Sequence, residues 1–218
     1  MTITAYLIFE LISLLASLSL YFQKSMPGYM KLFPVFIFVT IVVEIIGGML
    51  MDRGIPNVLL YNLFFTVEFV FYLFILRNFV HSRKVKKLIF YISLVYPVLA
   101  LINIFFIQVN TFESITYSLG CLLIVGVCVY YFLELFQLPH SVNLKREPAF
   151  WICSGLLFFY CCSFPLFGLN NYLLSTSGVI LQNLTSILSV INILLYSLFT
   201  IAFLCRVKFR KAIIEENK

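Results

Sequence analysis

Seven long apolar stretches constrain this chain more than any other feature. Each has about 20 residues, the length that an α-helix needs to cross the hydrocarbon core of a bilayer. Hydrophobic residues make up 62% of the sequence and charged residues 11%, whereas about 25% of the residues in a soluble domain are charged. The sequence therefore predicts an all-α membrane protein, a bundle of seven transmembrane helices. The expected spans are 2–22, 33–51, 58–80, 86–108, 112–136, 149–168 and 179–205.

The polar segments between these spans are too short to fold as a second domain. The longest are a loop around 137–148 and the stretch that follows residue 205. We expect a single seven-helix transmembrane domain over 1–205 and a short basic cytoplasmic tail over 206–218. The basic residues are spread over loops at the membrane edges, so we expect the lipid bilayer as a partner and no nucleic acid.

The distribution of positive charge predicts the orientation of the bundle. Fourteen of the fifteen lysine and arginine residues fall on one side of the predicted membrane, and only Arg53 falls on the other. Loops rich in Lys and Arg stay in the cytoplasm. The N-terminus is therefore predicted to lie outside and the C-terminus inside.

Three glutamates, Glu10, Glu44 and Glu68, interrupt the first three spans. A charged group at the centre of a bilayer costs about 3 kcal/mol on insertion scales. All three lie roughly 10–15 Å from the outer ends of their helices, and consecutive helices are usually neighbours. We expect the three side chains to meet in one polar cavity. At least one should be protonated at neutral pH, because burial and like-charged neighbours favour the neutral acid.

Other polar residues share the helix faces of the glutamates. Helical spacing predicts polar faces on the first three spans, and the last span adds a further polar stripe. Gly47 and Gly48 would let helices approach closely beside Glu44. Alternatively, each glutamate is protonated and only holds helices together through hydrogen bonds. The candidate ligand- or proton-binding residues are Glu10, Glu44, Glu68, Tyr6, Tyr61, Tyr72, Asn62, Thr40, Gln182, Ser189 and Asn192.

Residues for most enzyme chemistry are missing from the predicted spans. The only histidines, His81 and His140, fall in predicted cytoplasmic loops, and the six cysteines form no C-x-x-C pair. We therefore expect no catalytic residues, no cofactor and no zinc site, because zinc needs His or Cys ligands at metal-binding spacing. A site for Ca²⁺ or Mg²⁺ built from carboxylates alone stays open, since these ions take oxygen ligands.

Two segments, 61–79 and 147–168, are aromatic-rich and similar to a known kind of membrane region. They resemble the seven-span region at the N-terminus of some Bacteroidota sensor histidine kinases and their stand-alone relatives. The resemblance implies a sensing role in the bacterial inner membrane. The 218 residues contain no kinase domain, so the output would need a separate cytoplasmic signalling protein. The residues that carry the resemblance are Asn62, Glu68, Glu147, Pro148, Phe150, Trp151 and Gly155.

The sequence thus predicts a sensor or receptor-like membrane module with an outward-facing acidic pocket. Such a pocket would suit a small cationic or polar ligand, or protons. The alternative is a small proton-coupled secondary transporter. Transport predicts access from both faces and proton-dependent flux, whereas sensing predicts a cytoplasmic partner and no flux. An intramembrane enzyme is the least supported class, because no histidine lies at the depth of the glutamates.

Overall fold

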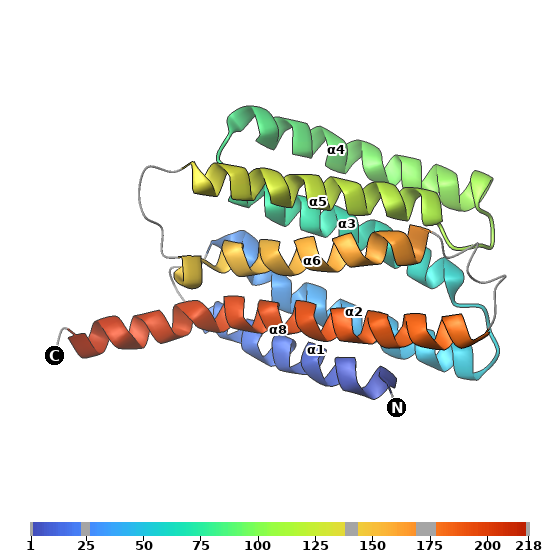
Figure 1. The fold of residues 1–218 in the computed structure, drawn as a ribbon, viewed down its shortest axis with the longest axis horizontal. Helices are drawn as coiled ribbons and strands as arrows, with labels where there is room; N and C mark the ends of the chain where they lie inside the picture. The colour runs from blue at the N-terminus through green and yellow to red at the C-terminus, as the bar shows by residue number, and fades with distance from the viewer. Residues whose placement is uncertain (1, 23–26, 138–143, 169–177, 217–218) are drawn as a thin grey trace.

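The computed structural model describes the backbone of residues 2–22, 27–137, 144–168 and 178–216, and the side chains of 5–22, 27–137, 144–167 and 186–205. These ranges are almost entirely helical and contain no strand. Long helices run side by side along the molecule (Figure 1). They are α1 (Thr2–Leu18), α2 (Phe33–Asp52), α3 (Val58–Phe79), α4 (Arg83–Ile102), α5 (Ser114–Phe136), α6 (Pro148–Gly168) and α8 (Gly178–Glu216).

Short helical turns extend or join the long helices. Two 3₁₀ turns, η1 (Ser19–Phe22) and η2 (Gly28–Leu32), lie between α1 and α2. A π-helical turn, η3 (Asn103–Ile107), continues α4, and the 3₁₀ turn η4 (Leu144–Arg146) precedes α6. The turns η1, η2 and η3 each adjoin a long helix and belong to the apolar spans rather than to the loops.

The predicted number of spans is confirmed. Seven described segments are long and apolar enough to cross a membrane, and large apolar side chains such as Phe22 and Phe106 remain 83% and 81% exposed on the bundle surface. Hydrocarbon rather than water suits such a surface. By length and composition, these are the helices of a multi-pass membrane protein. Three boundaries differ by three residues or more. The second span begins at Gly28 and the fourth at Arg83, and α8 continues as a helix to Glu216, because no Gly or Pro interrupts the basic segment after residue 205.

The helices pack in a defined order across the bundle. The contacts place α1 against α2 and α8, α6 between α5 and α8, and α3 against α2, α4 and α5. Helix α4 lies at one edge, and α1 begins at the opposite end of the molecule from the end of α8 (Figure 1). We call the end with the connections 80–82 and 144–147 the basic end, since it carries Arg83, Lys84, Lys145 and their neighbours. The end with the connections 53–57 and 108–113 is the opposite end.

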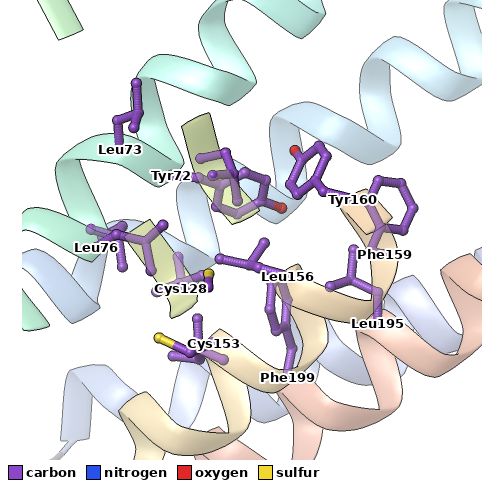
Figure 2. Packing of buried hydrophobic residues seen from close by; sticks show 14 of the residues in the cluster. Tyr72, Leu73, Leu76, Cys128, Cys153, Leu156, Phe159, Tyr160, Leu195 and Phe199 are labelled. Carbon is purple, nitrogen blue, oxygen red and sulfur yellow. The ribbon is translucent and has the colours of Figure 1, made fainter. Parts of the chain in front are cut away.

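Toward the basic end the bundle is filled by apolar and aromatic side chains. Tyr72, Leu76, Leu156 and Phe199 are each 1% exposed or less, and they come together from α3, α6 and α8 (Figure 2). Aromatic rings contact one another through this core, for example Tyr72 and Phe199 with centroids 6.2 Å apart. These side chains therefore close the centre of the bundle between α3, α6 and α8.

Candidate functional site

A cavity of about 520 Å³ lies between the helices toward the opposite end. This volume is within the usual range for small-molecule sites. Helices α1, α2, α3, α5, α6 and α8 contribute to its walls, and the connections 53–57 and 108–113 contribute to its rim. The lining residues are Tyr6, Glu10, Thr40, Glu44, Asn57, Val58, Tyr61, Phe64, Phe65, Glu68, Asn110, Thr111, Phe112, Tyr117, Phe159, Phe167, Leu188, Ser189, Asn192 and Tyr196.

The structure brings Glu10, Glu44 and Glu68 to the wall of this one cavity. Glu10 is 2% exposed and Glu68 is 8% exposed, so both carboxyl groups are almost completely withdrawn from the surface. The three groups are close enough to interact electrostatically. Each comes from a different helix, α1, α2 and α3, which pack in sequence. The shared depth read from the sequence is therefore a shared site.

Tyrosine hydroxyls hold the Glu44 side chain in place. Tyr6 donates a hydrogen bond to Glu44 Oε2 over 3.0 Å, and Tyr61 donates to the same oxygen over 3.4 Å. The Tyr61 ring packs directly over Gly47, one helical turn along α2 from Glu44. Gly47 thus has the close-approach role expected for it, whereas Gly48 meets no neighbouring atom.

One carboxyl oxygen of Glu10 accepts no hydrogen bond from the described residues. Its Oε2 atom is buried and has no hydrogen-bond partner among the described residues. The Tyr196 hydroxyl of α8 interacts with the carboxyl group of Glu10, and the Tyr160 hydroxyl of α6 interacts with that of Glu68. A buried oxygen without a donor is costly, and Glu10 is one of the residues that line the cavity.

The last helix contributes the polar stripe that the sequence predicts. Ser189, Asn192 and Tyr196 of α8 line the cavity, spaced as neighbours on one helix face. The Asn192 amide also donates to the Leu188 carbonyl over 3.0 Å. The side chain of Gln182, another candidate, lies outside the described residues.

Two candidate residues lie away from the cavity lining. Tyr72 is 0% exposed and packs one turn deeper than Glu68, against the rings of Phe36 and Phe199. Tyr72 does lie on the same face of α3 as Glu68, but aromatic side chains cover the part of this face that carries Tyr72. Asn62 is turned toward the connection 108–113, where its Nδ2 donates to the Thr111 carbonyl over 2.9 Å. It positions the rim instead of facing the cavity.

Four aromatic rings form a second part of the cavity wall that sequence reasoning missed. Phe65, Phe112, Tyr117 and Phe167 come from α3, the connection 108–113, α5 and α6. Their rings are in mutual contact, with Tyr117 and Phe167 centroids 4.8 Å apart and Phe65 and Tyr117 centroids 5.1 Å apart. A phenylalanine in an apolar span usually indicates a contact with lipid or core, so no sequence signal separates these rings from the others.

Glu113 was also missed, although it is a buried carboxyl group at the start of α5. It is 0% exposed; its Oε2 accepts a hydrogen bond from Thr116 over 2.7 Å, and its backbone N–H donates to Asn62. Burial raises the pKa of Glu113 to about 7, an effect that the Thr116 hydrogen bond partly offsets. The only signal in the sequence was its position at the edge of an apolar run.

The charges around the cavity all have one sign. No Lys, Arg or His is among its described lining residues, so the glutamates have no protein cation as a partner there. Among the described side chains, no group of three or more His, Cys, Asp or Glu residues is arranged to hold a metal ion. The described lining of the site is therefore acidic and aromatic.

Comparison with known proteins adds no family to this description. No protein-family model, curated protein or solved structure gives a significant match to the chain. The resemblance to sensor-kinase membrane regions stays a prediction from the sequence, and the cavity is the firmest basis for a functional proposal.

Proposed function

We propose that this protein is a sensor or receptor-like membrane module that binds a small cationic or polar ligand in the cavity. The observation that carries the proposal is the placement of Glu10, Glu44 and Glu68 in one cavity whose described lining residues include no cation. In a site of low dielectric constant, a bound cation interacts with carboxylates far more strongly than it would in water. The cavity thus selects for positive charge and hydrogen-bond donors.

The distribution of charge supports an outward-facing cavity. It lies toward the end opposite the one where Arg83, Lys84 and Lys87 are exposed. The positive-inside rule places those cations in the cytoplasm, most simply in the bacterial inner membrane that the sequence resemblance implies. There they are positioned to contact an acidic signalling protein or anionic lipid.

The packed half of the bundle favours sensing over transport. Tyr72, Leu76 and Phe199 fill the bundle on the basic side of the cavity and are each fully buried. A solute that moved through the protein would have to separate these side chains, whereas a sensor needs only to bind. The alternative, a proton-coupled secondary transporter, requires a second arrangement of this core.

Binding can be tested with the full chain in lipid nanodiscs. A panel of small cations and neutral polar molecules is screened for compounds that raise the melting temperature, since a ligand that binds the folded state stabilises it. We expect at least one stabilising compound, and we expect Glu44→Gln to remove the effect. Asp52→Asn is the matched control, because Asp52 lies on the same helix, is exposed and does not line the cavity. The proposal fails if no compound stabilises the protein, or if Glu44→Gln responds as the wild type does.

Transport is tested separately in liposomes. The stabilising compound is supplied outside, with a pH gradient across the membrane, and its uptake is measured. We expect no uptake above that of empty liposomes. Accumulation that depends on the gradient and is lost in Glu68→Gln would favour the transporter instead.

A further inference from the structure

The cavity has two chemically different parts, and this division indicates a class of ligand. The acidic part contains Glu10, Glu44 and Glu68 with Tyr6 and Tyr61 beside them. The aromatic part is the cluster of Phe65, Phe112, Tyr117 and Phe167. Tyr61 and Phe65, whose ring centroids are 6.1 Å apart, connect the two parts along one face of α3.

The acidic part offers hydrogen-bond acceptors and uses its own donors. The hydroxyls of Tyr6 and Tyr61 both donate to Glu44, and the hydroxyl of Thr40 donates to the Phe36 carbonyl over 3.0 Å. Three carboxyl groups, those of Glu10, Glu44 and Glu68, come from residues that line this part. A molecule that carries hydrogen-bond donors therefore suits it, and a protonated amine brings both donors and positive charge.

The aromatic part offers ring faces and edges but few polar atoms. Phe112 stacks on Phe167 with centroids 5.3 Å apart and an interplanar angle of 26°, while Phe65 meets Phe112 edge-on at 5.9 Å. Such a cluster gains from a planar apolar group that extends the stacking. An inorganic cation or a proton would leave this part of the cavity without a partner.

We propose that the ligand is an amphipathic organic cation, a protonated amine joined to an aromatic or planar apolar group. Its ammonium group binds among Glu10, Glu44 and Glu68, and its apolar group binds against Phe65, Phe112 and Phe167. This inference rests on the proposed function and narrows the class of its ligand. It excludes anions, metal ions and sugars as the principal occupant.

Three small molecules test the contribution of each part of the cavity to binding without any mutation. 2-Phenylethylamine carries both groups, ethylamine carries only the cation, and 2-phenylethanol carries only the ring with a neutral donor. Binding to the wild-type chain in nanodiscs is measured by isothermal titration calorimetry. We expect 2-phenylethylamine to bind at least about tenfold more tightly than either of the other two, because each lost charge or ring contact is worth roughly one such factor.

Matched variants then test whether the ring of the ligand binds in the aromatic part and its ammonium group in the acidic part. Phe112→Leu should weaken 2-phenylethylamine by about threefold or more and leave ethylamine unchanged. Phe106→Leu should change neither, because Phe106 lies nearby in the chain but is 81% exposed on the bundle surface. Glu44→Gln should weaken both amines, and Asp52→Asn neither. Each variant is compared with the wild type only if its unliganded melting curve remains cooperative.

The outcomes distinguish this inference from the proposed function. Equal binding of 2-phenylethylamine and ethylamine, equal binding of the amine and the alcohol, or no binding of the three probes overturns the amphipathic-cation class. If a neutral polar compound from the panel then binds in a Glu44-dependent way, the proposed sensor function stands and only the amphipathic-cation inference is wrong. If no compound of either kind binds, both are overturned.

Discussion

At the scale of single residues, the geometry of the acidic part depends on the absence of a side chain at Gly47. A Cβ atom at this position would overlap the Tyr61 hydroxyl and lie 2.7 Å from the Tyr61 Cζ atom. The Tyr61 ring therefore needs a glycine beneath it to reach Glu44. Gly48, the next residue, has no atom within 4 Å of the corresponding position.

We expect Gly47→Ala to destabilise the protein by about 1–3 kcal/mol, because it overpacks a closed contact. It should also displace the Tyr61 hydroxyl from Glu44. Gly48→Ala should be neutral or slightly stabilising, since alanine is the better helix former. Melting temperatures of the two variants in the same lipid provide the measurement. Equal melting temperatures would show that the Tyr61 ring does not depend on Gly47.

At the scale of elements, the connection 108–113 forms the rim of the cavity and is tied to α5 by a polar network. The Asn103 amide donates to Gln108 over 2.8 Å and to Thr116 over 3.0 Å, and Gln108 donates to Ser114 over 3.0 Å. Glu113 lies among them with one oxygen, Oε1, that has no partner among the described residues. Because Glu113 is buried, its neutral, protonated form is favoured over the carboxylate in this network.

The raised pKa of Glu113 predicts a pH-dependent rim. Below pH 4.5 its carboxyl group is protonated in both the folded and the unfolded chain. Between pH 4.5 and about 7 the unfolded chain loses this proton first, so the free energy of unfolding falls as the pH rises and stays lower above that range. The shift corresponds to about 3 kcal/mol at most. Tyr96, whose hydroxyl donates to the Thr116 carbonyl, is the titratable neighbour that interacts with Glu113.

Glu113→Gln should flatten this dependence. We expect the wild-type melting temperature to fall between pH 5 and 7.5, and the difference between wild type and Glu113→Gln to change over the same range. Comparing the two chains removes the contribution of the other carboxyl groups, which both retain. If the difference in melting temperature between wild type and Glu113→Gln is constant with pH, Glu113 does not titrate within this window.

The sequence could predict the helices and the acidic part of the cavity, but not the aromatic part. Apolar length defines a span regardless of its neighbours, and a glutamate such as Glu10 stands out in any apolar run. Phe65 and Phe22 look alike in the sequence, yet one lines the cavity and the other faces outward. Which of the two lines the cavity depends on how each helix is rotated about its own axis in the bundle. Tyr72 had the right periodicity, but its depth places it within the packed core.

At the scale of the whole molecule, the cavity lies in one half of the bundle, and buried side chains such as Tyr72 and Leu76 fill the centre of the other half. The cavity lies toward the opposite end, and the exposed cations gather at the basic end. Because loops rich in Lys and Arg stay in the cytoplasm, we predict that the half with the cavity faces the exterior.

We expect Asn110→Cys to react with a membrane-impermeant maleimide on intact cells, and Lys145→Cys to react only after the cells are opened. Both positions are exposed, and they lie in connections at opposite ends of the bundle. The unmutated chain sets the background from its native cysteines. Labelling of Lys145→Cys on intact cells would mean that the orientation is reversed.

The length of α8 has a mechanical consequence. Its 39 residues form a rod of about 58 Å, which is longer than the bilayer core and extends past the rest of the bundle (Figure 1). Ser189, Asn192 and Tyr196 touch the cavity on this same rod. About 36 Å separates Asn192 from Glu216 along the helix axis, so a tilt of about 5° at the cavity would move the far end by about 3 Å. A small tilt of α8 at the cavity would thus reach its far end as a larger displacement, which is the kind of output that the proposed sensing role needs.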